Sequence, residues 1–282
     1  MIRGWLIYSQ YEAKRNDFFV GELIANAHEM GIELRLLLRE YISLKITKNA
    51  ILCYAGQPLQ NADFALVRIN DFALSFQLEK MGLKVFNNSE TSLICNDKYL
   101  THCFANSLGI PTLDTTLVNK NNPHWQDVDE KLFPLVVKPL DLKGGEKVLF
   151  VKNKNDFIAG AHLYPERFLL QKPAKDLGED TRIYLLDKKI IAVAKRKSTT
   201  DFRSNFCLGG QASIVDPLPA QIDAIEKIIK NLDVHYVGVD FLSSGKQVFL
   251  NEIEDVVGAR MLYSLTDINP AKELIKSVLN KF

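Results

Sequence analysis

Three acidic residues near the C-terminal end of the chain have the spacing of a magnesium site. Asp240 lies among apolar residues, and Glu252 and Glu254 lie in the next apolar run. Because alternate residues of a strand share a face, the two glutamates are expected to project together. Three carboxylates on adjacent strands repel one another unless cations lie between them, and magnesium bound by carboxylates and nucleotide phosphates would meet that need. The alternative is a hydrogen-bonded core acid at Asp240 with both glutamates exposed.

A lysine and a glycine-containing loop could contact phosphate groups. Lys138 ends an apolar run, and the loop 141–147 that follows contains Gly144, Gly145 and two lysines. Adjacent glycines let backbone N–H groups approach an anion closely, and the lysines add positive charge. The Gly-x-x-x-x-Gly-Lys-Ser/Thr spacing of a P-loop is absent. The alternatives are a solvated lysine at a strand end and an ordinary hairpin tip.

Basic residues are dense in the following part of the chain. They are Arg182, Lys195, Arg196, Lys197 and Arg203. Arginine forks suit phosphate or carboxylate oxygens bidentately. Lys195 and Arg196 are adjacent on an expected strand and point opposite ways, so only one of them can line a given cleft. The alternative is a charged strand edge that faces solvent.

The elements that must position these residues change in character near residue 96. Before it, helices alternate with short apolar strands, which predicts a parallel three-layer α/β unit. The expected strands are 4–8, 32–38, 63–69 and 83–86, and the expected helices are 18–30 and 72–81. Polar, turn-rich sequence follows residue 38. No Gly-x-Gly-x-x-Gly turn is present, so dinucleotide binding by this unit is unsupported.

Beyond residue 96 the strands come in pairs and the helices are fewer, which predicts an α+β unit. A hairpin of 134–138 and 148–151 would enclose the glycine loop. Further strands are expected at 167–172, 181–186, 189–196, 236–242 and 247–253, with helices at 97–108 and 219–232. The predicted domains are an N-terminal α/β domain at 1–95, a glycine-loop subdomain at 96–175 and a metal-site subdomain at 176–282.

Composition narrows the partners and the compartment. The 282 residues suit two compact units, and 35 basic and 34 acidic residues leave a net charge of +1. That balance argues against nucleic acid or an anionic membrane as the main partner. Four widely spaced cysteines argue against a zinc site or a disulfide framework and fit a reducing compartment. No apolar run approaches membrane-spanning length, so a cytoplasmic protein is expected.

The order of these segments resembles the ATP-grasp superfamily, and within it the RimK-type amino-acid ligases, which add glutamate or similar amino acids to a carboxyl terminus. The resemblance spans roughly residues 87–270. Its motifs are Asn87-Asn-Ser, Asn96-Asp-Lys98, Leu108-Gly-Ile-Pro111, Pro134-Leu-Val-Val-Lys-Pro139, Gly178-Glu-Asp-Thr-Arg182, Lys195-Arg196, Asp201-Phe-Arg-Ser-Asn205, Gly209-Gly210, Gly238-Val-Asp240 and Asn251-Glu-Ile-Glu254. It implies a fold in which two α+β subdomains sandwich ATP behind the N-terminal domain.

The resemblance also implies roles for single residues. Two lysines would contact ATP phosphates, the glycine loop would close over them, and a hinge backbone would read adenine. These nucleotide-binding residues are Lys98, Lys138, Gly144, Gly145, Gln171, Lys172 and Pro173. Arg196 would steady the transferring phosphoryl group, with Arg203 and Asn205 near the phosphates or the acyl substrate. Asp240, Glu252 and Glu254 would hold magnesium, which manganese could replace.

The chain departs from the family pattern at several positions. Glu254 stands where many relatives carry asparagine, Lys172 replaces an acid common at the hinge, and Lys147 replaces a loop glycine. The segment 255–260 replaces the usual turn of small residues and proline. Since that turn borders the acceptor pocket in the family, the substrate cannot be transferred from any one relative.

Arg260 is the expected anchor for a substrate carboxylate. It follows Gly258 and Ala259, where the chain leaves the acid-bearing strand. Small residues allow close approach there, and a guanidinium fork matches a carboxylate bidentately. The alternative is an ion pair between Arg260 and a nearby acid such as Asp255 or Asp267.

The expected activity is ligation of a carboxylate to an amine. The carboxylate would attack the γ-phosphate of ATP to give an acylphosphate and ADP, and the amine would displace phosphate. Phosphoryl transfer needs chiefly positioning and charge neutralisation, which explains the missing nucleophile. The substrate would be an amino acid or peptide, and the resemblance implies a homodimer. The alternatives are a catalytically impaired nucleotide-binding regulatory protein and a phosphotransferase that stops at the phosphorylated product.

Overall fold

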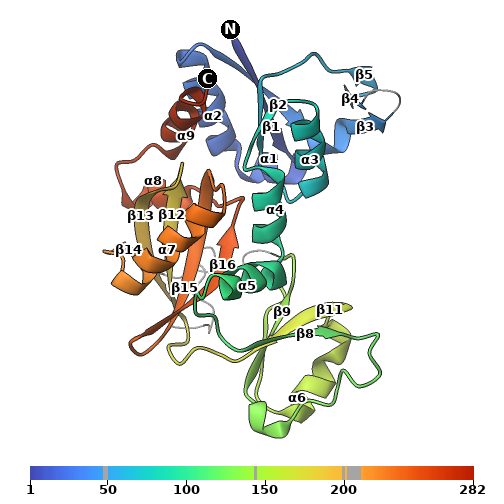
Figure 1. Cartoon of the computed structure of the whole chain (residues 1–282), viewed down its shortest axis with the longest axis vertical. Coiled ribbons are helices and arrows are strands. Elements are labelled where there is room, and N and C mark those ends of the chain that lie inside the picture. Colours follow the sequence, from blue (N-terminus) through green and yellow to red (C-terminus); the bar gives the residue numbers. More distant parts are fainter. Residues whose placement is uncertain (47–49, 143–144, 199–200, 202–210) are drawn as a thin grey trace.

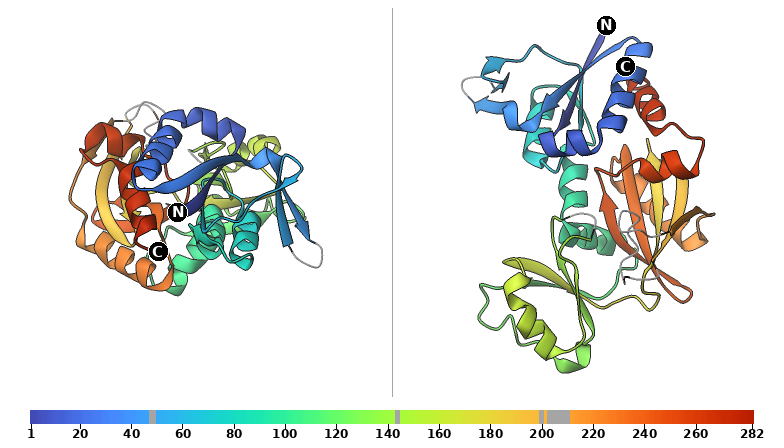
Figure 2. Two further views of the ribbon diagram at one scale, coloured as in Figure 1. Left: turned by 90° about the horizontal axis from the view of Figure 1, so that it is seen from above. Right: turned by 180° about the vertical axis from the view of Figure 1, so that it is seen from behind.

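The computed structural model of the chain places three main sheets along an elongated molecule (Figure 1). The structure describes residues 1–46, 50–142, 145–198, 201 and 211–282. The N-terminal sheet lies at one end, a five-stranded sheet lies in the middle and a smaller four-stranded sheet lies at the other end, as both views from the side show (Figure 1, Figure 2). No described helix is both long enough and apolar enough to cross a membrane.

The N-terminal unit is the parallel three-layer structure that the sequence predicts. Its sheet has the order β2-β1-β6-β7, and its strands are β1 (Ile2–Tyr8), β2 (Ile32–Leu38), β6 (Phe64–Val67) and β7 (Lys84–Phe86). Its helices are α1 (Gln10–Arg15), α2 (Asp17–Glu29) and α3 (Phe72–Lys80). Successive residues of β1 point to opposite faces. Leu6 and Tyr8 are buried in one core with α2, and Trp5 and Ile7 are buried in another core with α3.

A small antiparallel sheet in this unit corrects the sequence reading of residues 39–62 as turn-rich. It contains β3 (Ile42–Ile46), β4 (Ala50–Tyr54) and β5 (Gln57–Pro58) and protrudes beside the parallel sheet (Figure 1). Ile42 and Leu52 are buried in the core that contains α3. The polar residues between these apolar positions belong to the strands' exposed face, which is why the segment reads as a turn region.

The small sheet at the far end confirms the expected hairpin. Its order is β10-β9-β11-β8, and Leu149 of β10 pairs with Val137 of β9 in antiparallel register. Its elements are β8 (Thr115–Asn119), β9 (Leu135–Pro139), β10 (Leu149–Val151), α6 (Lys154–Ala159) and β11 (Arg167–Gln171).

Short 3-10 helices cover Arg39–Tyr41, Glu130–Leu132 and Gly160–Leu163.

The five-stranded antiparallel sheet has two different faces. Its order is β14-β13-β12-β15-β16, from β12 (Glu179–Leu186), β13 (Lys189–Lys197), β14 (Gln211–Ile214), β15 (Tyr236–Ser244) and β16 (Gln247–Glu254). One face is apolar, with Ile183 and Val239 in a core shared with α7 (Pro219–Asn231). On the other face, Tyr184 and Tyr236 pack into the core of the N-terminal unit. The rest of that second face is charged.

Helical packing crosses the domain ranges predicted from the sequence. The helices α4 (Ser89–Asn96) and α5 (Lys98–Ser107) both contact β16, although α5 falls in the predicted range 96–175. The C-terminal helices are α8 (Arg260–Leu265) and α9 (Pro270–Leu279), and α9 contacts α2 of the N-terminal unit. The chain therefore returns at its end to the unit in which it began.

Gly238 of β15 is a position where the fold requires the absence of a side chain. A Cβ atom there would lie 2.7 Å from Val257 Cγ2 and 3.3 Å from Arg182 Cδ, and Val257 is fully buried. We expect Gly238→Ala to lower the free energy of unfolding by about 1–3 kcal/mol, because the tightly packed site has no room for an added methyl group. Urea denaturation measures this change.

Gly21 provides the matched control for this substitution. It lies inside α2 with no atom within 4 Å of an added Cβ. Alanine has the higher helix propensity, so Gly21→Ala should raise the free energy of unfolding by roughly 0.5–1 kcal/mol. A Gly238→Ala protein as stable as the wild type would contradict the packing of Val257 against β15.

Candidate functional site

A cleft lies between the four-stranded sheet of β8–β11 and the charged part of the five-stranded sheet. The space within it, including the part open to solvent, is about 760 Å³. Helix α5, both sheets and the connection 172–178 contribute to its walls. Of the residues predicted to bind the nucleotide, it brings together Lys98, Lys138, Gly145, Gln171, Lys172 and Pro173.

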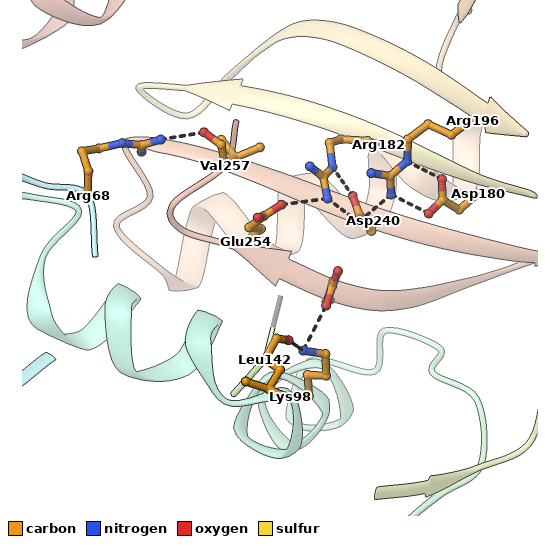
Figure 3. A network of polar contacts seen from close by, with 10 residues as sticks. Arg68, Lys98, Leu142, Asp180, Arg182, Arg196, Asp240, Glu254 and Val257 are labelled. Carbon is orange, nitrogen blue, oxygen red and sulfur yellow. Dashed lines mark hydrogen bonds and ion pairs between the residues drawn. The ribbon is translucent and has the colours of Figure 1, made fainter. Parts of the chain in front are cut away.

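The floor of the cleft is built on the carboxylate of Asp240, which is only 1% exposed. Asp240 is paired with Arg182 across β15 and β12. Arg182 Nε donates to Asp240 Oδ1 and Arg182 NH2 donates to Asp240 Oδ2, both at 2.7 Å. Arg196 NH2 donates to the same Oδ2 at 2.7 Å (Figure 3). Such forked contacts fix the carboxylate in position as well as in charge.

This network keeps Asp240 ionised. Burial alone would raise the pKa of Asp240, but the guanidinium groups of Arg182 and Arg196 outweigh burial and hold that pKa well below its usual range. Arg196 is also bound by Asp180, whose Oδ1 accepts from Arg196 Nε at 2.6 Å. Arg196 is therefore held beneath the cleft at 3% exposure, and its predicted contact with a phosphoryl group stays a prediction.

The two glutamates lie beside this network on the same face of the sheet. Arg182 NH2 lies 2.8 Å from Glu254 Oε2, and Lys98 Nζ lies 3.4 Å from Glu252 Oε2. The alternative of a hydrogen-bonded core acid is correct for Asp240. It is wrong for the glutamates, which are only partly exposed and lie against Lys98 and Arg182. In this structure, arginine and lysine side chains supply the positive charge between the three acids.

The acids nevertheless offer what a magnesium ion needs. Among the described residues, Asp240 Oδ1 accepts a single hydrogen bond, which leaves one of its two acceptor positions. The side chains of Glu252 and Glu254 are 25% and 18% exposed. Within the described part of the chain, no group of three or more acids, histidines or cysteines is close enough to hold a metal as the side chains stand. Magnesium binding by these acids stays a prediction that requires Arg182 or Lys98 to move.

Lys138 is buried in the cleft and contacts a residue that the sequence analysis did not select. Its Nζ donates to Asn251 Oδ1 at 2.7 Å. Burial lowers the pKa of Lys138 to about 8, with the opposing carboxylate of Glu252 raising it and the ammonium of Lys98 lowering it further. Lys138 is therefore no solvated strand-end lysine.

A β-bulge explains why Asn251 was missed. Asp240 pairs with Glu252 and Phe241 pairs with Leu250, which leaves Asn251 as an extra residue on β16. Two successive residues, Asn251 and Glu252, therefore both line the cleft, against the alternation of a regular strand. The sequence carries no residue-type signal for this bulge.

The connection after β11 has few backbone donors for a base. The N–H of Lys172 donates to the carbonyl of Asp114 at 3.0 Å, and Pro173 has no N–H. Ala174, which also lines the cleft, makes no backbone hydrogen bond among the described residues. Among the described residues, the carbonyl of Lys172 and the N–H of Ala174 are thus the cleft-side backbone groups without a backbone partner, and adenine binding at the hinge stays a prediction. Ala174 lies one residue beyond the predicted hinge.

Gln171 contributes its side chain to the support of this connection. It is 1% exposed, and its Nε2 donates to Thr115 Oγ1 at 2.9 Å and lies 3.3 Å from His102 Nε2. Burial, together with the charges of Lys138 and Lys98, lowers the pKa of His102 to about 4, so the imidazole is neutral.

The remaining predicted residues are Gly144, Arg203, Asn205 and Arg260. Gly144, Arg203 and Asn205 lie outside the described residues. Arg260 is exposed at the start of α8, where its NH2 donates to the carbonyl of Arg15 at 3.2 Å, and it is not part of the cleft wall. Its role as a carboxylate anchor stays a prediction.

Arg182 is the main functional side chain that the sequence analysis noticed but did not select. It joins Asp240 to Glu254. The available signal was its spacing of two residues from Asp180, which places both side chains on one strand face.

Lys147 has a positive φ of 54°. Glycine adopts this conformation without strain, which accounts for the family's glycine at that position.

The Asp240 network generates a stability prediction. We expect Asp240→Ala to lower the free energy of unfolding by about 3–5 kcal/mol, because it leaves two buried guanidinium groups without their shared partner. Glu273→Ala is the matched control, since Glu273 pairs with Lys276 on the exposed face of α9. Its loss should cost below about 1 kcal/mol. Equal unfolding midpoints for the two variants would rule out the buried network.

The comparisons with known sequences agree with this architecture. Residues 95–278 match the model of the RimK-like ATP-grasp domain. The chain is 33% identical over 193 residues to the uncharacterized protein MG011 of Mycoplasma genitalium, covering 67% of this chain and 64% of that protein. It is 28% identical over 257 residues to a probable alpha-L-glutamate ligase of Shewanella pealeana, covering 86% of this chain and 55% of that protein. The chain thus spans less than two thirds of both relatives.

Other matches extend over nearly the whole chain. A probable alpha-L-glutamate ligase of Maridesulfovibrio salexigens is 26% identical over 279 residues, covering 93% of this chain and 91% of that protein. Two crystal structures share the fold. A RimK domain protein ATP-grasp of Sphaerobacter thermophilus has a TM-score of 0.71 at 18% identity, covering 98% of this chain and 99% of that one. A D-alanine–D-alanine ligase of Bacillus anthracis, complexed with ATP, has a TM-score of 0.71 at 18% identity, covering 99% and 97%. Because the family model matches well over half of its length, this chain belongs to the RimK-like ATP-grasp family.

Proposed function

We propose that this protein is an ADP-forming ligase that joins a carboxylate to an amine through an acylphosphate, with an amino acid or peptide as substrate. The observation that carries the proposal is the cleft in which two lysines face a carboxylate-and-arginine network between two sheets. Family membership and the relatives named as probable glutamate ligases support it.

ATP would lie in the cleft with its adenine at the connection after β11 and its phosphates at the two lysines. Its adenine would lie against the carbonyl of Lys172 and the N–H of Ala174, at the connection between the sheets. Its phosphates would lie near Lys138 and Lys98, whose charges are held by Asn251 and Glu252 in the absence of a nucleotide. A phosphate oxygen is a stronger partner for an ammonium than the neutral amide of Asn251.

Magnesium would be held by Glu252 and Glu254, with Asp240 Oδ1 as a further oxygen donor. When bound, it supplies positive charge beside the phosphate oxygens. Arg182 would then release Glu254 while keeping its bonds to Asp240. A freed part of the Arg182 guanidinium would lie next to the transferring phosphoryl group, where it can neutralise developing charge.

The proposed reaction has two steps. A substrate carboxylate oxygen forms a bond to the γ-phosphorus, the bond from that phosphorus to the bridging oxygen breaks, and ADP leaves. An amine nitrogen then attacks the acyl carbon, inorganic phosphate leaves, and the nitrogen loses a proton as the amide forms. The protein's part is to position the reactants and neutralise charge, so it needs no nucleophile of its own.

The test of the proposed function is substrate-dependent release of ADP. With ATP and magnesium, we screen amino acids and short peptides as carboxylate and amine, and we add hydroxylamine to trap an acylphosphate as a hydroxamate. We expect ADP and hydroxamate with a suitable carboxylate, and loss of at least about tenfold in rate for Lys138→Ala, whose charge-assisted contact with phosphate is missing. Lys246→Ala, in the turn between β15 and β16 and outside the cleft wall, is the control.

Two outcomes would point to other functions. Tight ATP binding with no ADP release for any pair of substrates would favour a nucleotide-binding regulatory protein. A stable phosphorylated product that no amine consumes would favour a phosphotransferase.

Nucleotide affinity should fall as the pH rises above about 8. Lys138 has a pKa of about 8 in the free protein, and phosphate oxygens stabilise its ammonium and raise that pKa in the complex. Between these two pKa values the complex binds more protons than the free protein, so binding takes up a proton and weakens with rising pH. Calorimetry in buffers of different ionisation enthalpy, from pH 7 to 9.5, measures the uptake. Lys138→Ala should bind more weakly and take up no proton above pH 8, and uptake that persists in this variant would assign the proton to another group.

A further inference from the structure

An arginine of the N-terminal unit reaches into the turn that follows the acid-bearing strand. Arg68 lies directly after β6 and is 4% exposed. Its NH2 donates to the carbonyl of Val257 at 2.6 Å (Figure 3). Its NH1 donates to the carbonyl of Asp255 at 3.3 Å. One guanidinium fork therefore bonds two carbonyls of a single turn, 255–258.

Two asparagines hold the same turn. Asn87 Nδ2 donates to the carbonyl of Asp255 at 3.2 Å, and Asn96 Nδ2 donates to Asp255 Oδ2 at 3.0 Å. Asn87 also accepts from the N–H of Tyr236 and donates to its carbonyl. The turn is thus fixed to the start of β15 and to the residues that lead out of the N-terminal unit.

The turn begins one residue after Glu254. Glu254 pairs with Gly238 across β16 and β15, and its carboxylate bonds Arg182. The buried side chain of Val257 packs where Gly238 has no Cβ, close to the stem of Arg182. A movement of the turn would therefore displace both Glu254 and the packing beside Arg182.

Stability alone does not explain a charged side chain at this place. The guanidinium of Arg68 lies against the rings of Tyr236 and Phe19, at 5.3 and 5.9 Å, and against backbone carbonyls. Burial lowers the pKa of Arg68, but the nearby tyrosines and the Asp255 carboxylate outweigh burial and raise it. Burying a charge is costly, and apolar replacements of buried ionic groups are often neutral or stabilising. What an apolar residue cannot do is fix two carbonyls of the turn at once.

We propose that Arg68 is a positioning residue for the magnesium-nucleotide site, acting through turn 255–258 on Glu254. This turn lacks the proline that the family resemblance leads one to expect, and proline fixes its own φ angle. In this chain the hydrogen bonds of Arg68 take over that restraint. The proposal rests on the proposed function, because it concerns the residues that would hold magnesium there.

The test is the magnesium dependence of ADP binding in Arg68→Lys. Lysine keeps the charge but is a point donor that cannot hold two carbonyls with a planar fork. We expect the magnesium concentration for half-maximal ADP binding, measured by calorimetry, to rise about tenfold, because a ligand displaced by a fraction of an ångström loses much of its effect. ADP affinity in excess chelator should stay at the wild-type value, since Lys138 and the hinge are untouched.

Arg39→Lys is the matched control. Arg39 donates to Asp71 Oδ2 at 2.7 Å and to the carbonyl of Ile42 at 3.1 Å, so it also joins a carbonyl, but wholly within the N-terminal unit. It should keep the wild-type magnesium dependence. A lower unfolding midpoint for Arg68→Lys with unchanged magnesium dependence would mean that Arg68 only joins the two units, which overturns the proposal.

A measurement on the wild-type protein covers the case in which Arg68→Lys does not fold. Amide hydrogen exchange of peptides covering 255–260 should slow more with ADP and magnesium than with ADP and chelator. Equal exchange in the two states overturns the proposal, because the turn would then not respond to the metal. If the wild-type protein binds ADP equally well with and without magnesium, the metal assignment in the proposed function is wrong. If ADP binding by the wild-type protein depends on magnesium, and Arg68→Lys shows the same magnesium dependence, only the proposed role of Arg68 is wrong.

Discussion

The arrangement of the surrounding side chains depends on the burial of the Asp240 carboxylate. An ionised carboxylate at 1% exposure is stable only with cations against it, and Arg182 and Arg196 fill that need from two neighbouring strands. Both arginines must then have their remaining donors satisfied. Asp180 serves Arg196 and Glu254 serves Arg182, so one buried acid extends into a network across four strands. Gly238 is part of the same constraint, because Val257 and the stem of Arg182 pack against the place where a Cβ would stand.

The alternation of strand residues lets one sheet face serve two purposes. On β12, Asp180 and Arg182 belong to the charged network, and Tyr184, two residues further along the same face, is buried in the core of the N-terminal unit. The N-terminal unit therefore closes the apolar end of the face and leaves the charged end open to the cleft. Helix α9 strengthens this arrangement, since it packs against α2 after the chain has left the sheet. The same strands therefore determine both where the N-terminal unit packs and where the cleft lies.

The sequence was informative where a pattern is local. Alternating apolar residues predicted the strands, and the order of the motifs predicted the ATP-grasp fold that the family model confirms. Lys98, Lys138 and Gln171 line a common cleft, and their contact with a nucleotide stays a prediction. The need for cations among the three acids was also foreseen. The sequence could not show that Arg182 lies between two of them, because only strand register decides which side chains across a sheet meet.

Features that depend on irregular backbone or on distant packing could not be foreseen. Asn251 lines the cleft because of a bulge. The N–H of Lys172 bonds the carbonyl of Asp114, which leaves the N–H of Ala174 as the hinge donor without a backbone partner among the described residues. Arg260 looked suited to a carboxylate by its neighbours in sequence. The fold also brings the carbonyl of Arg15 beside it, from a helix far away in the chain, and its role as a carboxylate anchor stays a prediction.

The two departures near the end of β16 are best understood together. Glutamate at 254, in place of the family's usual asparagine, adds a negative charge and one methylene. In the structure that charge is neutralised by Arg182 at 2.8 Å, so the charge that faces an incoming metal is not simply increased. The longer side chain also makes the position of its carboxylate more dependent on the backbone that follows. That backbone is held by Arg68, Asn87 and Asn96, all of which come from residues before the glycine loop. In the proposed function Glu254 would move from Arg182 to a metal, and a turn with fixed carbonyls would control that movement better than a freely moving one. We therefore interpret the extra charge at Glu254 and the buried Arg68 together, because the turn that Arg68 holds controls the position of the Glu254 carboxylate.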